Sequence, residues 1–177
     1  MVGLPRRQAG LTALYLGVFA AVWFSVPKAD PPLRSVLVVG SVVALLTAAV
    51  GAVLVARAGR RAAGERDRSA DRRYGLVVAA EVGVGLIGAL LLAAAGLTGY
   101  IPVLVCAVVG IHFVPLAPVL HDRLLVPLGV AVTLVALAGL VVGLVSGVSA
   151  GLVVGTGAGI LLLAYAVLAL FRTRRVA

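Results

Sequence analysis

The amino-acid sequence predicts an all-α membrane protein, a bundle of six spanning helices with both chain ends on the cytoplasmic side. Of the 177 residues, 63% are hydrophobic and 12% are charged, whereas soluble domains are about 45–50% apolar and about 25% charged. The apolar residues form six continuous runs, and about 20 such residues cross a bilayer as a helix. The basic residues gather at alternate ends of these runs.

The six runs predict six helices in a single domain, 1–177. The first is the shortest, and Trp23 near its end suits the aromatic belt at the membrane interface. It is too long for the apolar region of a signal peptide, and no good cleavage site follows it. The apolar residues do not alternate with polar ones, which excludes the strands of a β-barrel. The predicted helices are Ala9–Val26, Leu33–Ala56, Tyr74–Leu97, Tyr100–Leu120, Leu124–Val145 and Ala150–Phe171.

The orientation follows from the basic residues, which favour the cytoplasmic side of short-looped membrane proteins. With the N-terminus inside, 13 of the 15 Lys and Arg residues fall on that side, and only Lys28 and Arg34 fall outside. The composition, with a single lysine and much Ala, Gly, Val and Leu, is typical of a GC-rich bacterial gene. We therefore expect a multi-pass protein of the bacterial inner membrane.

An arginine-rich cytoplasmic loop, 57–73, separates the second and third predicted helices. It holds seven arginines and three acidic residues. Near a membrane surface each basic residue gains about 1 kcal/mol from anionic lipid, so we expect lipid headgroups, and not nucleic acid, as its partner. The alternative is that the loop only sets the orientation. The expected headgroup contacts are Arg57, Arg60, Arg61, Arg72 and Arg73.

Glycines recur at every fourth position late in the chain and indicate close helix packing. Such ridges let helix backbones approach where lipid provides no hydrophobic drive for association. We expect the fifth and sixth helices to pack against each other through them as a glycine zipper; a seam between two copies of the chain is the alternative. The six positions are Gly139, Gly143, Gly147, Gly151, Gly155 and Gly159.

Two ionisable residues, Glu81 and His112, lie well inside the apolar runs. A charge at the bilayer centre costs about 2.5–3.5 kcal/mol on insertion scales, so such residues face the bundle interior and find partners. Glu81 lies roughly 10 Å from the cytoplasmic end of its helix and His112 roughly 12 Å from the same side, at a rise of ~1.5 Å per residue. Because a short turn joins the two helices, they should be antiparallel neighbours, and the similar depth makes an ion pair or hydrogen bond between the carboxylate and the imidazole feasible. The sequence does not determine whether the two side chains touch.

The surroundings of this pair are consistent with a polar site. Pro115 and Pro118 leave backbone carbonyls without helical donors next to His112. Thr133 and Tyr165 fall at comparable depth on other helices and are predicted lining groups. The pair would anchor or relay a proton or small polar solute; the alternative is a structural clasp that fixes helix register.

Other chemistries find little support. Gly83–Gly88 matches the dinucleotide pattern G-x-G-x-x-G, but it lies inside an apolar helix and not at a strand-to-helix turn. One buried carboxylate and two histidines make a thin metal ligand set, so we expect no metal and no cofactor. We expect Cys106, the single cysteine, to be a small apolar residue packed in the interior. No nucleophile stands beside a base, and an enzyme is the less favoured class.

The segment Gly110–Ala117, GIHFVPLA, which follows Tyr100-Ile101-Pro102, resembles a family of small uncharacterised bacterial multi-pass membrane proteins. In that family a G-x-H-F-x-P-L-A segment follows a helix that begins near an arginine and bears a glutamate, as Arg73 and Glu81 do here. The resemblance covers roughly residues 72–130 and implies no established activity.

Three functions are therefore weighed. The leading one is a small transporter or permease-like protein that uses Glu81 and His112. The second is a structural or regulatory membrane subunit of a larger complex, which the glycine ridge and the lack of soluble domains favour. The third is an intramembrane enzyme that acts on lipid.

Overall fold

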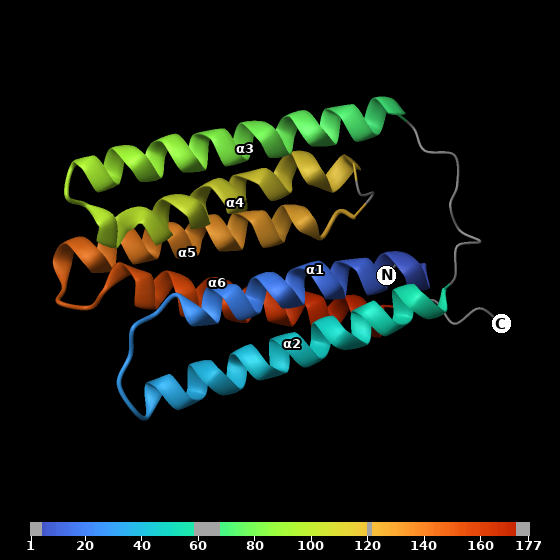
Figure 1. Ribbon diagram of the computed structural model, residues 1–177, viewed down its shortest axis with the longest axis horizontal. Helices are drawn as coiled ribbons and strands as arrows, with labels where there is room; N and C mark the ends of the chain where they lie inside the picture. The colour runs from blue at the N-terminus through green and yellow to red at the C-terminus, as the bar shows by residue number, and fades with distance from the viewer. Residues whose placement is uncertain (1–4, 59–67, 120–121, 173–177) are drawn as a thin grey trace. The chain divides into compact units, whose positions relative to one another are not determined.

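The computed structural model describes residues 5–58, 68–119 and 122–172, and within these residues it is helical without strands. The elements are α1 (Arg6–Ser25), α2 (Leu33–Arg57), α3 (Arg68–Ala94), the 3₁₀ turn η2 (Thr98–Tyr100), α4 (Ile101–Val119), α5 (Leu125–Val145) and α6 (Ala150–Phe171). The all-α prediction is confirmed (Figure 1).

Five of the described helices are long and apolar enough to cross a membrane, α4 being counted together with η2. In α3 the described apolar part is shorter, Glu81–Ala94. The membrane character of the chain is thus confirmed in its coarse form, whereas the sixth span and the orientation stay predictions.

The contacts divide the chain into two compact units, one of Met1–Glu65 with Gly159–Ala177 and one of Arg66–Ala158. The first unit is built on the antiparallel pair α1 and α2 (Figure 1). A Cβ on Gly51 of α2 would lie 2.6 Å from the carbonyl oxygen of Gly10 and 2.6 Å from the backbone nitrogen of Leu14. The two backbones therefore meet at glycine, where no side chain separates them.

The same unit includes the end of α6. Ala9 of α1 and Ala169 of α6 lie in one buried cluster. The ring of Phe24 covers Gly159, where a Cβ would lie 2.7 Å from a ring carbon. Gly159 on α6 thus leaves space for the Phe24 ring of α1.

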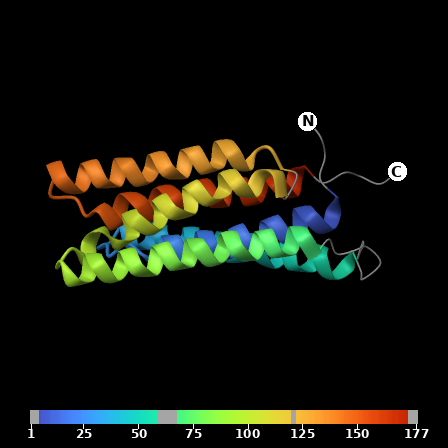
Figure 2. The same cartoon turned by 90° about the horizontal axis from the view of Figure 1, so that it is seen from above.

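The second unit contains α3, α4, α5 and the beginning of α6. Helices α4 and α5 run antiparallel in both views (Figures 1 and 2). They approach at Gly110 and Gly129, where a Cβ on Gly129 would lie 2.6 Å from the carbonyl oxygen of Gly110. Beside this contact the Cys106 thiol donates to the Val132 carbonyl at 3.4 Å. Cys106 is buried as predicted, and it also contributes a polar link.

The predicted glycine ridge is divided among different neighbours. Gly139 and Gly143 of α5 face α6, where a Cβ on Gly143 would lie 2.9 Å from the Ala150 Cβ, and one on Gly139 would meet the Val154 side chain. Gly155 is buried and Gly151 partly buried, and Gly159 faces Phe24. Gly147 lies in the turn between the helices with nothing within 4 Å of its Cβ position, so its predicted packing role is wrong. The zipper as an association motif stays a prediction.

A tight turn joins α3 to α4. Gly96 has φ +73°, a left-handed conformation that glycine adopts without steric cost. The Leu97 N–H donates to the Leu92 carbonyl at 2.7 Å, and the Gly96 N–H donates to Ala93 at 3.0 Å. These are the two bonds of a Schellman motif, which closes the end of a helix. The chain reverses within a few residues, and α4 starts at Ile101.

Helix α3 begins earlier than hydropathy indicates. The predicted start is Tyr74, but the helix runs from Arg68, so the last six residues of the predicted loop 57–73 are helical. Hydropathy marks only the lipid-facing part of a helix, and a helix can continue into water with charged residues. As a consequence Glu81 lies at the middle of α3.

The turn before α5 also differs from expectation. The sequence favours a solvated turn at His121–Arg123, and Arg123 is exposed, but Asp122 is buried to 5% exposure; His121 lies outside the described residues. The Asp122 carboxylate accepts from the Leu124 N–H at 3.2 Å, and its carbonyl accepts from the Leu125 N–H. Asp122 therefore holds the turn that leads into α5, because its side chain and its carbonyl both accept hydrogen bonds from residues just after it.

We expect Gly51→Ala to destabilise the protein, because its methyl group would press on the backbone of α1. Overpacking costs about 1–3 kcal/mol, which exceeds the gain of up to ~1 kcal/mol when alanine replaces a helical glycine. The matched control is Gly83→Ala in α3, whose Cβ position has nothing within 4 Å. Thermal unfolding in detergent should show a lower midpoint for Gly51→Ala than for Gly83→Ala; equal midpoints would contradict the close approach.

Candidate functional site

The site is built on the hairpin of α3 and α4. The tight turn at Gly96 makes the two helices antiparallel neighbours, and Gly88 of α3 lies against the Leu104 side chain of α4. Glu81 is at the middle of α3, and His112 is near the middle of α4. The hairpin therefore places the two ionisable residues at the same level.

The carboxylate and the imidazole are in contact. His112 Nδ1 lies 2.9 Å from Glu81 Oε2, with side-chain exposures of 10% and 20%. The contact that the similar depth makes feasible is thus present. Both side chains are mostly covered by the protein, and each lies against the ionisable group of the other.

The contact has the length of a hydrogen bond but not its direction. Nδ1 makes no well-directed hydrogen bond within the described residues, so the carboxylate oxygen lies off the Nδ1–H axis. Since the distance is already short, alignment needs rotation of a side chain and no movement of the helices. A directed hydrogen bond between the two groups is thus within reach of a side-chain rotation.

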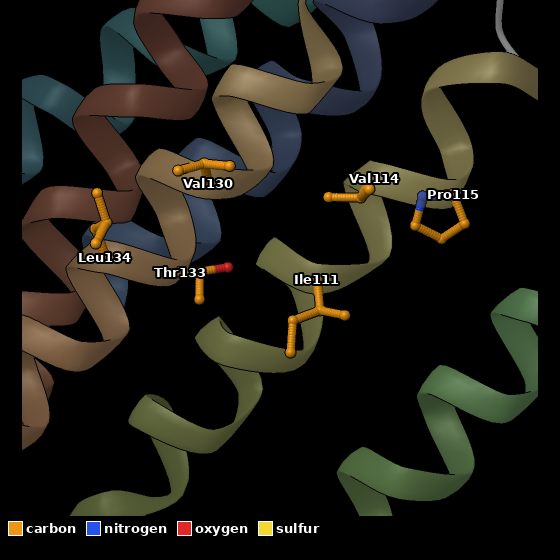
Figure 3. Close-up of a pocket in the computed structure, with 6 residues that line it drawn as sticks. All are labelled: Ile111, Val114, Pro115, Val130, Thr133 and Leu134. Carbon is orange, nitrogen blue, oxygen red and sulfur yellow. The ribbon is translucent and has the colours of Figure 1, made fainter.

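Thr133 lies in a different place from the one predicted. Its hydroxyl donates to the Gly129 carbonyl at 2.8 Å, within its own helix. Figure 3 shows it with Val130 and Leu134 on α5, facing Ile111, Val114 and Pro115 on α4, around an apolar groove of about 350 Å³. Neither Glu81 nor His112 lines this groove.

Tyr165 is buried in α6, in the unit of α1 and α2. The described contacts therefore bring together Glu81 and His112, and Thr133 lines the apolar groove instead. Sequence depth locates a residue along a helix, but its direction around the helix axis depends on packing.

The arginines predicted to contact lipid headgroups are described in part. Arg57 is exposed as the last residue of α2. Arg72 and Arg73 belong to the first turns of α3. Arg60 and Arg61 lie outside the described residues.

Two polar contacts in this unit are not evident from the sequence. The Tyr100 hydroxyl donates to the Gly143 carbonyl at 3.0 Å and ties η2 to α5. The Asp122 carboxylate accepts from the Leu124 N–H in the turn that leads into α5. Both residues adjoin turns, where a tyrosine or an aspartate is an ordinary surface residue, so no sequence pattern marks them.

Comparison with known proteins gives no match to a family model, a curated protein or a solved structure. The resemblance of Gly110–Ala117 to small bacterial multi-pass proteins therefore stays a prediction.

A double-mutant cycle tests the energetic coupling of the pair. Glu81→Gln and His112→Ala should each destabilise the protein by about 1–3 kcal/mol, because each leaves a buried polar partner unsatisfied. The double variant should cost less than the sum of the two, and thermal unfolding in detergent measures all four proteins. Strictly additive losses would show that the 2.9 Å contact carries no coupling.

Proposed function

We propose that this chain is a small transporter or permease-like protein in which Glu81 and His112 carry a proton. The observation that supports it is the 2.9 Å contact of two ionisable side chains near the middle of α3 and of the apolar helix α4. Ionisable residues within membrane spans typically mark ion pathways or proton relays.

The direct contact favours a proton over a larger solute. A solute that bound between carboxylate and imidazole would have to separate them, whereas a proton passes along the line that joins them. Glutamate and histidine are also the residues from which proton relays in pumps and transporters are built. A small polar solute remains the broader form of the proposal.

The proposed topology places both termini and the segment between α2 and α3 in the cytoplasm. The distribution of arginine supports it: 13 of 15 basic residues fall on that side. The proposed location is a bacterial inner membrane, and anionic headgroups on the cytoplasmic side are the proposed partners of Arg57 and its neighbours.

Cysteine labelling in intact cells tests this topology. Cys106 is the single cysteine and is buried, so Cys106→Ala gives a background without reactive thiol. In that background, Ser149→Cys between α5 and α6 should react with an impermeant maleimide, and Ala58→Cys after α2 should react only after lysis. The reverse pattern would invert the orientation.

Proton flux into dye-loaded proteoliposomes tests the mechanism. Glu81→Gln and His112→Ala should each lower the flux roughly a hundredfold, the lower end of what a positioned proton-transfer group contributes. Asp30→Asn, which removes an exposed carboxylate from the α1–α2 loop, should leave the flux unchanged and serves as the control.

Equal flux in the parent, Glu81→Gln and His112→Ala would end the transport proposal. The pair would then be a structural clasp, and the alternative function, a structural or regulatory membrane subunit, would take its place. One observation favours that alternative: Gly83 and Gly85 of α3 have nothing within 4 Å of their Cβ positions, which leaves room for a closely packed helix. Crosslinking in native membrane would then capture a stoichiometric partner.

A further inference from the structure

A polar hollow opens where the α1–α2 hairpin turns. It has a volume of about 490 Å³ and lies between the end of α1 and the start of α2, in a link with a cis Pro31–Pro32 bond. Its lining residues are Ser25, Pro27, Lys28, Ala29, Asp30 and Arg34. Two cationic side chains and one carboxylate therefore surround one space.

These charges do not neutralise one another. Within the described part of the chain, Asp30 forms no ion pair with Lys28 or Arg34. Asp30 and Arg34 are four residues apart, a spacing that favours such pairs on helices, and the Arg34 N–H donates to the Asp30 carbonyl at 3.2 Å. The backbone thus holds the two residues one turn apart, while their side chains border the hollow as separate charges.

The hollow belongs to the membrane interface. Helices α1 and α2 are of spanning length, and the hollow lies at their shared end. Within one turn of it, Val22 is 53% exposed and Val36 is 64% exposed, and these apolar surfaces suit acyl chains. A molecule with a polar headgroup at this level and hydrocarbon below it fits both surfaces.

We propose that this hollow binds a phospholipid headgroup that carries a phosphodiester and a primary ammonium, the phosphoethanolamine type. The guanidinium of Arg34 and the ammonium of Lys28 would take the phosphate, since Arg and Lys are the residues that bind it. The Asp30 carboxylate would accept hydrogen bonds from the ligand ammonium. The Ser25 hydroxyl donates to the Val22 carbonyl at 2.6 Å and still offers an acceptor.

The carboxylate determines the headgroup. A trimethylated ammonium has no N–H to donate to Asp30, and a glycerol headgroup has no positive charge. The site should therefore prefer phosphoethanolamine over phosphocholine and phosphoglycerol lipids of the same acyl chains. This preference is independent of any proton pathway at Glu81 and His112.

Native mass spectrometry of the full chain tests the proposal, after exchange into an equimolar mixture of the three lipids. The parent protein should retain the phosphoethanolamine lipid about three- to fivefold over the other two, the gain expected from one exposed charged contact. Asp30→Asn, which keeps an acceptor oxygen but removes the charge, should weaken this preference, and Asp30→Ala should abolish it. Lys28→Gln and Arg34→Gln should weaken retention of all three lipids. The matched control is Arg123→Gln, an exposed cation in the turn before α5, which should keep the parent pattern.

Two results would overturn the proposal: equal retention of the three lipids by the parent, or an unchanged preference in Asp30→Ala. Displacement of the lipid by an excess of free phosphoethanolamine would assign the hollow to a soluble compound of the same chemistry and not to a lipid. Thermal unfolding of each variant identifies any loss that reflects misfolding; Asp30→Asn is an isosteric change at an exposed position and should fold as the parent does.

Discussion

Close approach of helix backbones at glycine is the constraint on which the rest of this structure depends. In lipid, burying an apolar side chain against another helix gains little, because acyl chains are equally apolar. Helices are then held by dispersion contacts and polar links, and both require short distances. Gly10 with Gly51 and Gly110 with Gly129 supply these distances, with Cβ positions 2.6 Å from the facing carbonyl oxygen in each pair. Where larger side chains take part, as Phe24 does over Gly159, they also fill the space above a glycine.

The candidate site follows from this packing and from one turn. Gly96 closes α3 with a Schellman motif, so α4 returns beside α3 with little intervening chain, and residues equally far from the turn lie at similar depth. Gly88 admits the Leu104 side chain and brings the helices together. In this geometry a carboxylate on α3 and an imidazole on α4 at similar depth lie close enough to interact. Lipid acyl chains provide neither group with another hydrogen-bond partner.

The sequence predicts where each helix begins and ends better than it predicts which side of the helix packs against its neighbours. Hydropathy places α6 at its observed bounds and most other ends within one to three residues, because lipid contact and apolar sequence have the same cause. It misplaces the start of α3 by six residues, since charged residues continue that helix beyond the apolar run. The similar depth of Glu81 and His112 is predictable because a short turn joins their helices, whereas the contact itself also depends on which faces of the helices meet. The surroundings of Thr133 and Tyr165 are not predictable either, because rotation about a helix axis is set by packing. Asp122 is buried in a turn where it accepts backbone hydrogen bonds, which hydropathy does not represent.

The residue types at Glu81 and His112, an acid and a base, bear on whether the pair serves only to hold α3 and α4 in register. Replacing a buried ion pair by well-packed apolar residues is often neutral or stabilising, because desolvation offsets the attraction. Register can be fixed at lower cost by neutral groups: Cys106 with Val132 and Tyr100 with Gly143 link helices through single uncharged donors. Thr47 and Thr133 satisfy their hydroxyls within their own helices. An acid and a base in direct contact are thus an expensive way to join α3 and α4, and this cost supports the proposed proton role over a purely structural one.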